Sequence, residues 1–331
     1  MTKNYFFTGE TKVVNGVTLK QIECEEFGVG GWIENESNLA QEGECWVSDD
    51  AMVYGNAKVY GNAEVSGDAE IYGNAEIYGN AIVFDNARVF DDAEVGDEAM
   101  VYDDAEVFIN AKVLGYSKVC GYASVCGSSE LYNNANVSGD ANVCGNVKMY
   151  NNAVVSKNAK VDGNVVLDGN ARVSGNAKVS GNARVSNNAV IFGNAMILGN
   201  AKITDNAIIY GDAAIYGKAK VSGDAEIFGD AKVFGNAEVF DNANIYDNAQ
   251  IYGTAQVFGD AKVFGDAKVY LGAKVFDMAK VYDYAQVYFK AMVYGNAEVY
   301  GNAKVVGNAK VGGNAKVCGG EEVGGKTVIN N

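Results

Sequence analysis

Residues 53–64 read Val-Tyr-Gly-Asn-Ala-Lys and then Val-Tyr-Gly-Asn-Ala-Glu, and this hexapeptide decides the fold. It continues from Val47 to Val323 without an insertion. Each of the 47 positions spaced by six residues is Val or Ile, except Leu131, Met149 and Leu167. Ala follows four residues later, except at Ser117, Ser129, Val147, Val165, Glu321 and Thr327. Such self-similarity predicts a repeat architecture.

The face on which each hexad residue lies follows from strand geometry. With the aliphatic position written as i, alternation along a strand points i and the Ala at i+4 to the same side. The charged position i−1 and the Tyr, Phe or Ser at i+1 then point outward. Positions i+2 and i+3 are mostly Gly-Asn, Gly-Asp or Asp-Asn, which favour a tight corner. One hexad buries too little to stand alone, so successive turns must stack.

This pattern resembles the hexapeptide-repeat, left-handed parallel β-helix family, in which three hexads close one triangular turn. The resemblance implies an all-β, single-stranded left-handed parallel β-helix of about 15–16 coils. The chain departs from the family by placing Gly at i+2 and aromatic residues at i+1. The handedness comes from the resemblance alone, because the usual crossover rule favours the opposite sense.

Residues 1–46 are not hexads and predict a β-hairpin cap. Lys12 to Leu19 read as a hairpin on the Asn15-Gly16 turn. Both tryptophans, Trp32 and Trp46, lie in this segment. An open solenoid end exposes strand edges and needs a cover. We therefore expect Trp32 and Trp46 to pack in the cap, with Trp32 as a ligand platform as the alternative. Residues 47–323 form the repeat, and 324–331 a C-terminal tail.

A second resemblance is confined to the N-terminal part of the chain and the first hexads. The run from Gly30 to Val47, which leads directly into hexads, is similar to the start of the YdcK-type hexapeptide-repeat proteins. These proteins are often labelled as transferases, a label that rests on fold analogy.

Composition excludes several partners. The formal charge is −16, and the Lys and Arg side chains are spread singly along position i−1. This disfavours nucleic acid and anionic membranes as partners. The sequence contains no run of 18 apolar residues, so we expect no membrane span. The N-terminus has no adequate apolar segment for a secretory signal. We expect a cytoplasmic protein.

The six cysteines lack the paired spacing of a disulfide framework. Cys126 and Cys144 are three hexads apart and would stack on adjacent turns, within bonding range. The favoured interpretation is two reduced thiols, with a disulfide as the alternative. No CxxC motif occurs, so we expect no zinc site.

Acidic corners gather between Asp85 and Asp104. Asp85 and Asp103 are three hexads apart and would lie on one corner. Stacked carboxylates can hold a hard cation. A solvated acidic face is the favoured interpretation, because no calcium-loop motif is present.

Aromatic residues dominate position i+1 from Tyr210 to Tyr300, where 16 positions are Tyr or Phe except Ser222. With three hexads per turn they form three outward ladders: Phe228-Tyr246-Phe264-Tyr282-Tyr300, Phe234-Tyr252-Tyr270-Tyr288 and Phe240-Phe258-Phe276-Tyr294. Strand packing explains them, since aromatic residues favour strands and cover each other. A contact surface for protein, sugar rings or another copy explains them equally well.

The chain contains no His. Hexapeptide-repeat acyltransferases generally use a His as general base, and the γ-class carbonic anhydrases of this fold hold zinc with three. No other side chain titrates unperturbed near neutrality. The repeat also lacks the protruding loop that commonly helps wall a transferase active site. We predict no catalytic residue, no metal site and no cofactor.

The sequence thus favours a non-enzymatic, rigid β-solenoid scaffold with the aromatic ladders as the contact zone. Its partner would be a protein or glycan surface, or another copy in a trimer or end to end. Two alternatives stay open: a divergent acyl-CoA-dependent acyltransferase that works as a trimer, and a carbohydrate-binding rod. Ice binding is weaker, because Thr204 and Thr254 are isolated.

Overall fold

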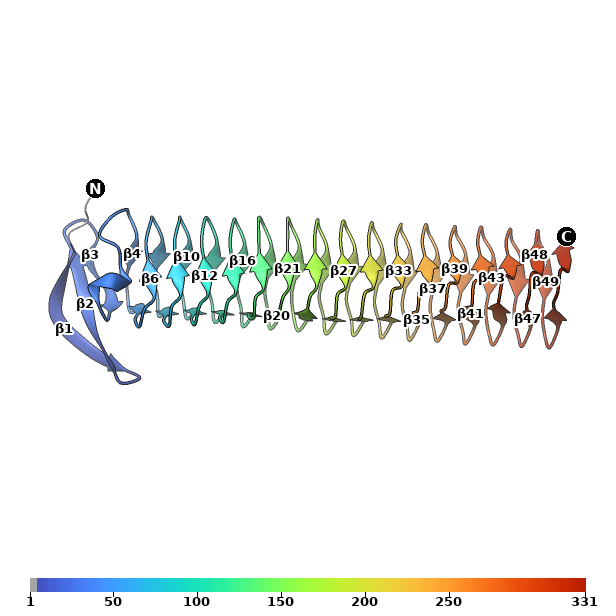
Figure 1. Cartoon of the computed structure of the whole chain (residues 1–331), viewed down its shortest axis with the longest axis horizontal. Coiled ribbons are helices and arrows are strands. Elements are labelled where there is room, and N and C mark those ends of the chain that lie inside the picture. Colours follow the sequence, from blue (N-terminus) through green and yellow to red (C-terminus); the bar gives the residue numbers. More distant parts are fainter. Residues whose placement is uncertain (1–4) are drawn as a thin grey trace. The chain divides into compact units, whose positions relative to one another are not determined.

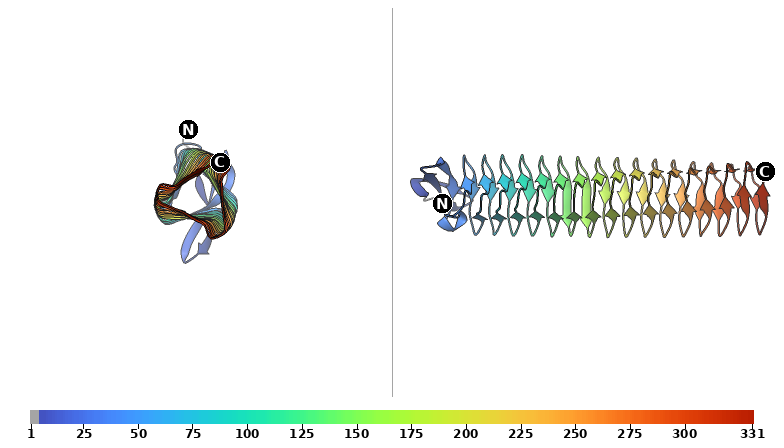
Figure 2. Two further views of the ribbon diagram at one scale, coloured as in Figure 1. Left: turned by 90° about the vertical axis from the view of Figure 1, so that its right-hand side faces the viewer. Right: turned by 90° about the horizontal axis from the view of Figure 1, so that it is seen from above.

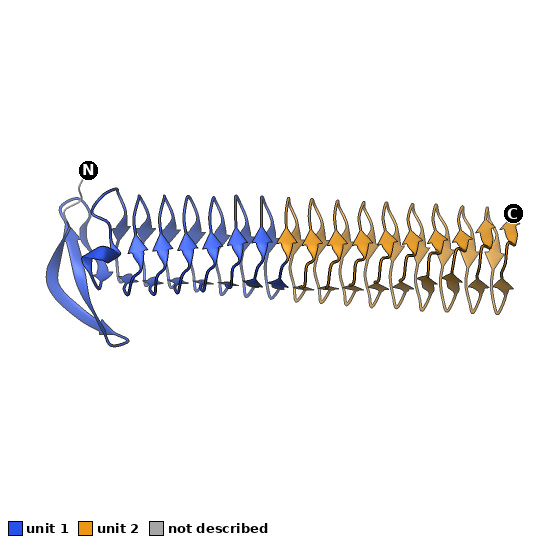
Figure 3. Cartoon of the chain, viewed as in Figure 1, with its two compact units in different colours: residues 1–164 blue, residues 165–331 orange. Residues whose placement is uncertain are grey.

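The computed structural model describes residues 5–331, and within them every regular element except one short helix is a β-strand. The exception is the 3-10 helix η1 (Glu36–Asn38). Figure 1 shows the order of the elements. The chain divides into two compact units, residues 1–164 and 165–331, which Figure 3 colours separately.

The first unit begins with the predicted hairpin. β1 (Phe6–Val14) pairs antiparallel with β2 (Val17–Cys24), and Val14 lies opposite Val17. Asn15 and Gly16 form the connection with φ of 52° and 82°, as a two-residue hairpin turn requires. β3 (Gly28–Ile33) pairs antiparallel with β2 and parallel with β5 (Met52–Val53). The hairpin therefore continues one sheet of the repeat.

The repeat strands are short because each hexad contributes only positions i−1 and i. In the first unit they run in steps of six residues from β4 (Trp46–Val47) to β19 (Asn136–Val137). The remaining strands of this unit are β20 (Asn142–Gly145), β21 (Lys148–Met149), β22 (Val154–Val155) and β23 (Lys160–Gly163).

The second unit repeats this pattern. Its strands run in steps of six from β24 (Val166–Leu167) to β40 (Lys262–Val263). The later strands are β41 (Lys268–Tyr270), β42 (Lys274–Val275), β43 (Lys280–Val281), β44 (Gln286–Tyr288), β45 (Met292–Val293), β46 (Glu298–Val299), β47 (Lys304–Val305), β48 (Lys310–Gly312), β49 (Lys316–Val317), β50 (Glu322–Val323) and β51 (Val328–Asn330).

Parallel pairing at a fixed offset of three hexads builds three sheets within each unit. In the first unit Val53 lies opposite Ile71, Val65 opposite Val83, and Val59 opposite Ile77. In the second unit Val173 lies opposite Ile191 in the same way. Every third strand therefore falls on the same side, and Figure 2 shows the three sides of the turns. The predicted turn of three hexads and the parallel β-solenoid are confirmed, whereas the left-handed sense stays a prediction.

The core is made of the predicted inward residues. The aliphatic residue at i and the Ala at i+4 are buried throughout both units, nearly all with no exposed surface. Burying one Val contributes about 1.5–3 kcal/mol, whereas ordering one residue costs about 1–2 kcal/mol of backbone entropy. A six-residue hexad therefore cannot fold alone and depends on the turns on either side.

Two serines replace Ala in the core of the first unit without leaving a polar group unpaired. Ser117 donates its hydroxyl to the carbonyl of Leu114, and Ser129 donates to the carbonyl of Cys126, both at 2.7 Å. Each hydroxyl thus bonds to the backbone of its own corner, so the substitution keeps the fold.

Residues 324–331, which the sequence assigns to a C-terminal tail, include one further strand. They contain β51, which pairs parallel with β48 and places Val328 opposite Lys310. The hexad spacing continues to Ile329, six residues beyond Val323. The last turn thus keeps the register although its Gly-rich sequence obscures it.

Candidate functional site: aromatic ladders and apolar corners

The aromatic residues at i+1 form continuous stacks in the second unit. Consecutive rings along each column lie 4.7–5.4 Å apart between centroids, with interplanar angles of at most 11°. The stacks contain all thirteen predicted residues: Phe228, Phe234, Phe240, Tyr246, Tyr252, Phe258, Phe264, Tyr270, Phe276, Tyr282, Tyr288, Tyr294 and Tyr300. The offset of three hexads places each ring directly over the next, because the strands are about 4.8 Å apart.

These rings are half-buried rather than freely exposed. Each ring covers the faces of its neighbours, so the ladder presents mainly ring edges. Burial raises the pKa of the phenols of Tyr246, Tyr252 and Tyr270 above their ordinary value. Stacking alone therefore accounts for much of the burial that a contact surface would also provide.

The ladders extend beyond the thirteen residues predicted from the sequence. Phe192 stacks on Tyr210 at 5.0 Å and lengthens the first column. In the first unit Tyr54, Tyr72, Phe90 and Phe108 form another column, with centroids 4.9–5.2 Å apart. The signal was present, since all four occupy position i+1 at intervals of three hexads.

The corners share a regular pattern of hydrogen bonds from one turn to the next, which we call the corner code. An aspartate at i+2 adopts positive φ, as at Asp241 with 57°, and its carboxylate accepts the backbone N–H of the residue one turn later. Asp241 accepts from Gly259 at 3.2 Å, and Asp85 accepts from Asp103 at 3.3 Å. The acidic corners of residues 85–104 thus hold successive turns together, a role that the sequence analysis missed.

Asparagines at i+3 stack in the same direction. In the second unit Asn170, Asn188 and Asn206 each donate an amide N–H to the side chain one turn later, and the series ends at the carboxylate of Asp224. The donor–acceptor distances are 2.8–2.9 Å. An aspartate ends such a ladder because it accepts but cannot donate.

Seven large apolar side chains break this corner code. In the first unit Ile109, Tyr116 and Tyr122 occupy three successive corners, and in the second unit Leu271, Met278, Tyr284 and Phe289 occupy four. All seven are exposed. Within residues 47–323 only Phe192 and Met196 join them as exposed large hydrophobic residues. We name the two groups collar 1 and collar 2.

Three collar residues also hold unfavourable backbone conformations. Ile109, Leu271 and Phe289 lie at i+2 with φ of 64°, 62° and 63°. The left-handed region disfavours bulky residues, and a β-branched residue there is a strong outlier. Elsewhere in the repeat this position is Gly, Asn or Asp, apart from Lys157. The bulky residues at these corners are visible in the sequence, but no prediction was made from them.

The two cap tryptophans have different surroundings. Trp46 is buried and stacks on Phe27 with centroids 5.4 Å apart. Trp32 is half-buried, its indole N–H lies 3.4 Å from the Asp50 carboxylate, and the Lys12 ammonium lies 4.6 Å above its ring. Trp46 thus packs inside the cap, whereas the Trp32 ring is partly exposed beneath the Lys12 ammonium.

A buried amide joins the cap to the first turns. Asn38 has no exposed surface, accepts the backbone N–H of Asn35, and donates to the carbonyls of Gly55 and Ala57. The Tyr5 hydroxyl lies 3.1 Å from the carbonyl of Leu39, and burial raises the pKa of Tyr5 to about 12.

The favoured interpretation of the cysteine pair is wrong. Cys126 and Cys144 form a disulfide with Cα atoms 4.6 Å apart, whereas reduced thiols were favoured. Stacking on adjacent turns brings the two Cβ atoms into bonding range, which the spacing itself had indicated. The bond joins two adjacent turns of the first unit.

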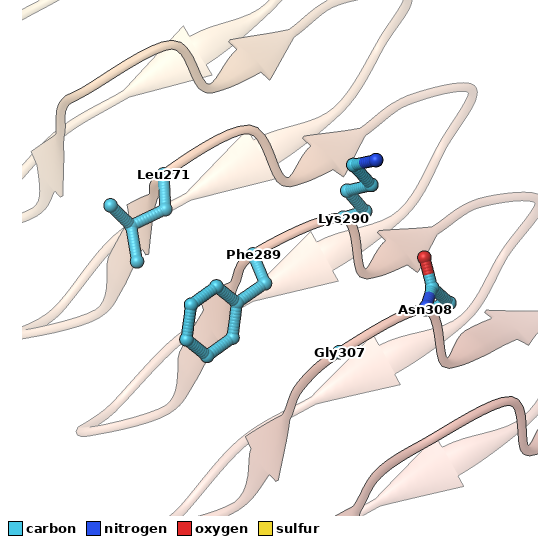
Figure 4. Close-up of a pocket in the computed structure, with 5 residues that line it drawn as sticks. All are labelled: Leu271, Phe289, Lys290, Gly307 and Asn308. Carbon is cyan, nitrogen blue, oxygen red and sulfur yellow. The ribbon is translucent and has the colours of Figure 1, made fainter.

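No group of three or more Cys, Asp or Glu side chains between residues 5 and 331 is arranged to hold a metal ion. Open hollows occur on the surface of the second unit. One of about 480 Å³ is lined by Leu271, Phe289, Lys290, Gly307 and Asn308, and Figure 4 shows these residues. Among the described residues no helix is long and apolar enough to cross a membrane.

Comparison with known proteins finds a family similarity in the middle of the repeat, across the end of the first unit and the beginning of the second. Residues 153–256 match the family model described as "Bactofilin: Polymer-forming cytoskeletal". The match covers less than half of the chain, so this chain is similar to that family over residues 153–256. A search of curated proteins finds no relative.

Among solved structures the chain is similar to one described as "putative acetyltransferase from Desulfovibrio desulfuricans G20". The identity is 11%, the TM-score is 0.20, and the match covers 83% of this chain and 66% of the other. This chain thus spans slightly less than two thirds of that protein. At this TM-score the likeness carries no argument about activity.

Proposed function

We propose that this protein is a non-enzymatic, polymer-forming scaffold whose β-solenoid units give it stiffness. The observation that carries the proposal is the match of residues 153–256 to a family described as polymer-forming and cytoskeletal. The absence of His from the sequence and the unbroken hexad register add support, because both remove the usual means of acyl transfer.

Stiffness follows from the bonds between successive turns. In the second unit the backbone N–H of Phe240 donates to the carbonyl oxygen of Val257 at 3.0 Å, and equivalent backbone hydrogen bonds join the other successive turns. Ion pairs such as Lys220–Glu238, at 2.8 Å, cross the same gap, and the Lys220 ammonium lowers the pKa of Glu238. Bending such a unit would stretch many of these bonds together.

Within this proposal the three ladders from Phe228 to Tyr300 serve as contact surfaces on the three sides of the turns. Their ring edges offer a repeated apolar and hydroxyl-bearing strip to another protein face. Replacing Tyr252, Tyr270 and Tyr288 with Ser should weaken association if the ladder is a contact. Unchanged association would leave packing as the role of the ladder.

Sedimentation velocity over a concentration series tests the scaffold function. We expect the weight-average sedimentation coefficient to rise with concentration as copies assemble. A single monomeric species from micromolar to hundreds of micromolar protein would refute the polymer. Calorimetric titration with acetyl-CoA and longer acyl-CoAs should be flat, and saturable binding would favour the transferase alternative.

A cytoplasmic location stays a prediction.

A further inference from the structure

Five lysines gather along one edge of the second unit. We define the basic edge as residues 268–274, 286–292 and 304–310, which form the same corner in three successive turns together with the strand residues on either side. It contains no Asp or Glu, although the chain carries −16 overall. Its positive charges are those of Lys268, Lys274, Lys290, Lys304 and Lys310.

Nearby side chains leave these lysines without an opposite charge. In its sheet Lys268 lies between Gln250 and Gln286, whereas Lys220, also in the second unit, pairs with Glu238 one turn later at 2.8 Å. Among residues 5–331, none of the five lysines of the basic edge is in an ion pair. Their charge therefore remains available to a partner.

The surrounding turns do not reverse the charge of the basic edge. Asp277 and Asp283 lie at the other two corners. The corresponding residues of the turn before, 250–256, include no charged side chain. In the turn after, residues 321–328 carry two Glu and one Lys, a net charge of −1 against +5 for the basic edge.

The middle of the basic edge is apolar. Leu271 and Phe289 of collar 2 occupy its corner on successive turns, and Figure 4 shows both side chains projecting from the ribbon. Their positive φ is unfavourable for bulky residues, and strain of this kind gathers at functional sites. Gly307 follows at the same corner and has no side chain to fill the hollow of about 480 Å³ beside Phe289 and Lys290. The basic edge thus combines positive charge with space for an apolar side chain.

The first unit carries an edge of the opposite charge. We define the acidic edge as residues 64–70, 82–88 and 100–106, which again form one corner in three successive turns together with the strand residues on either side. Ile82 and Met100 add apolar side chains to it. Its seven carboxylates are those of Glu64, Asp68, Glu70, Asp85, Asp103, Asp104 and Glu106.

Two cations lie beside these carboxylates. Arg88 pairs with Glu106, and Lys12 of the hairpin interacts electrostatically with Asp68 and Glu70. Five negative charges remain on the acidic edge when both cations are counted. That number equals the five positive charges of the basic edge.

The two edges also space their charges in the same way. From the first turn to the third, the basic edge has two, one and two lysines, and the acidic edge has three, one and three carboxylates. Successive turns are about 4.8 Å apart in both edges. Each pattern is the same in either direction along the edge, so the charges match whichever way the partner runs. Two edges of one repeat explain this match, whereas a nucleic acid or a lipid surface does not.

We propose that the basic edge of one copy binds the acidic edge of a second copy of this chain. This inference rests on the proposed scaffold function and identifies the contact through which copies join. Because the two edges differ, each copy keeps one edge of each kind for further partners, and copies can add in series. Opposite charge orients the encounter, and the apolar centre of the basic edge then packs against the partner.

Charge reversal of either edge tests this contact. The basic-edge variant combines Lys268→Glu, Lys274→Glu and Lys310→Glu, all at i−1, where Glu is common in this repeat. The acidic-edge variant combines Glu64→Lys, Asp68→Lys and Asp104→Lys, at i−1 and i+3, positions that Lys occupies elsewhere in the repeat.

Two further variants separate charge from apolar contact. The matched control combines Lys178→Glu, Lys202→Glu and Lys262→Glu, the same charge change at i−1 in the second unit but outside the basic edge. The apolar-centre variant combines Leu271→Asn with Phe289→Asn and keeps the net charge. Asn is accommodated at this corner position with positive φ, as at Asn187.

Sedimentation velocity over a concentration series gives the readout, with circular dichroism to verify folding. We expect the wild type and the control to assemble alike, and added salt to weaken both. Each edge variant should need at least about tenfold more protein to assemble. The apolar-centre variant should also assemble more weakly, and full assembly would remove Leu271 and Phe289 from the contact.

An equimolar mixture of the two edge variants is the most specific arm of the test. One intact basic edge and one intact acidic edge remain in the mixture, so we expect complexes of two chains that grow no further. A mixture in which both variants stay monomeric would show that the two edges do not meet and would overturn the inference.

Three other results would also overturn it. Assembly of both edge variants at the wild-type concentration would do so and leave the scaffold function standing. Equal weakening in the control would show a general charge effect. Binding of duplex DNA or phosphatidylserine vesicles through these lysines, with self-assembly unchanged by either reversal, would assign the basic edge to that partner. A wild type that stays monomeric would refute the scaffold function together with the contact.

Discussion

Replacing Leu271 should make the protein more stable, although Leu271 is one of its few exposed large hydrophobic residues. Leu271 holds φ of 62°, a conformation that costs an L-residue about 1–2 kcal/mol. Leu271→Asp relieves part of this strain, because Asp tolerates the left-handed region. Its carboxylate would also accept the N–H of Phe289, as Asp241 accepts that of Gly259. This hydrogen bond adds about 0.5–1.5 kcal/mol.

We therefore expect Leu271→Asp to stabilise the surrounding turns by about 1–2 kcal/mol. Leu271→Gly removes the strain but loosens the unfolded chain, so it should gain only about 0.5–1 kcal/mol. Leu271→Ala keeps the strain and should change little. The order Asp, Gly, then Ala with the wild type is the signature of the corner code.

Hydrogen exchange measured by mass spectrometry suits this test, because repeat proteins open locally and not as one cooperative unit. Amides of β41 to β45 should exchange more slowly in Leu271→Asp, at protein concentrations below those at which copies associate. Faster exchange in Leu271→Asp than in Leu271→Ala would refute the reasoning. It would mean that the leucine makes a stabilising contact within its own chain.

Four further predictions concern the core, the cap, the disulfide and the ladders. Ile227→Ala should cost about 2–5 kcal/mol and speed amide exchange in the neighbouring turns, whereas retained protection would contradict its inward position. Asn38→Ala should cost about 1–3 kcal/mol, since it leaves the buried carbonyl of Ala57 without the Asn38 amide, and should make the cap susceptible to limited proteolysis. Denatured, unreduced protein should show four reactive thiols, whereas six would show that the disulfide does not form. Replacing Cys126 and Cys144 with Ser should lower the free energy of unfolding by up to about 3 kcal/mol. In the first unit Tyr132 stacks on Tyr150, and burial and then the Glu130 carboxylate raise the pKa of Tyr132 to about 12 against an ordinary 10.0. The stability present below pH 10 should therefore fall between pH 10 and 12, because the unfolded chain loses this proton first, and phenolate absorbance measures the titration.

The repeat could be predicted from the sequence because its inward positions obey one rule throughout. Val or Ile at i and Ala at i+4 leave only one face for the core, and a slip of one residue would bury charge. The Asn15-Gly16 hairpin was equally readable, since this pair suits a two-residue turn. Outward aromatic ladders then followed from the turn length alone.

The remainder depended on contacts between turns, which a single hexad does not reveal. The roles of Asp85 and Asp241 require knowing that their carboxylates reach the backbone of the next turn. The Cys126–Cys144 bond was misjudged because the expectation about cellular compartment outweighed the spacing. The collars were overlooked because attention to the hexad consensus hides the few corners that depart from it.

The fold depends most on which side chains face the inside of each turn, and one pair of variants measures this directly. Val221 has no exposed surface, whereas Ser222, the next residue, lies at the outward position. Val221→Asp should lower the midpoint of thermal melting followed by circular dichroism, because the core offers the carboxylate no partner. Ser222→Asp should melt like the wild type, whereas equal melting of the two variants would contradict the inward placement of the aliphatic residues.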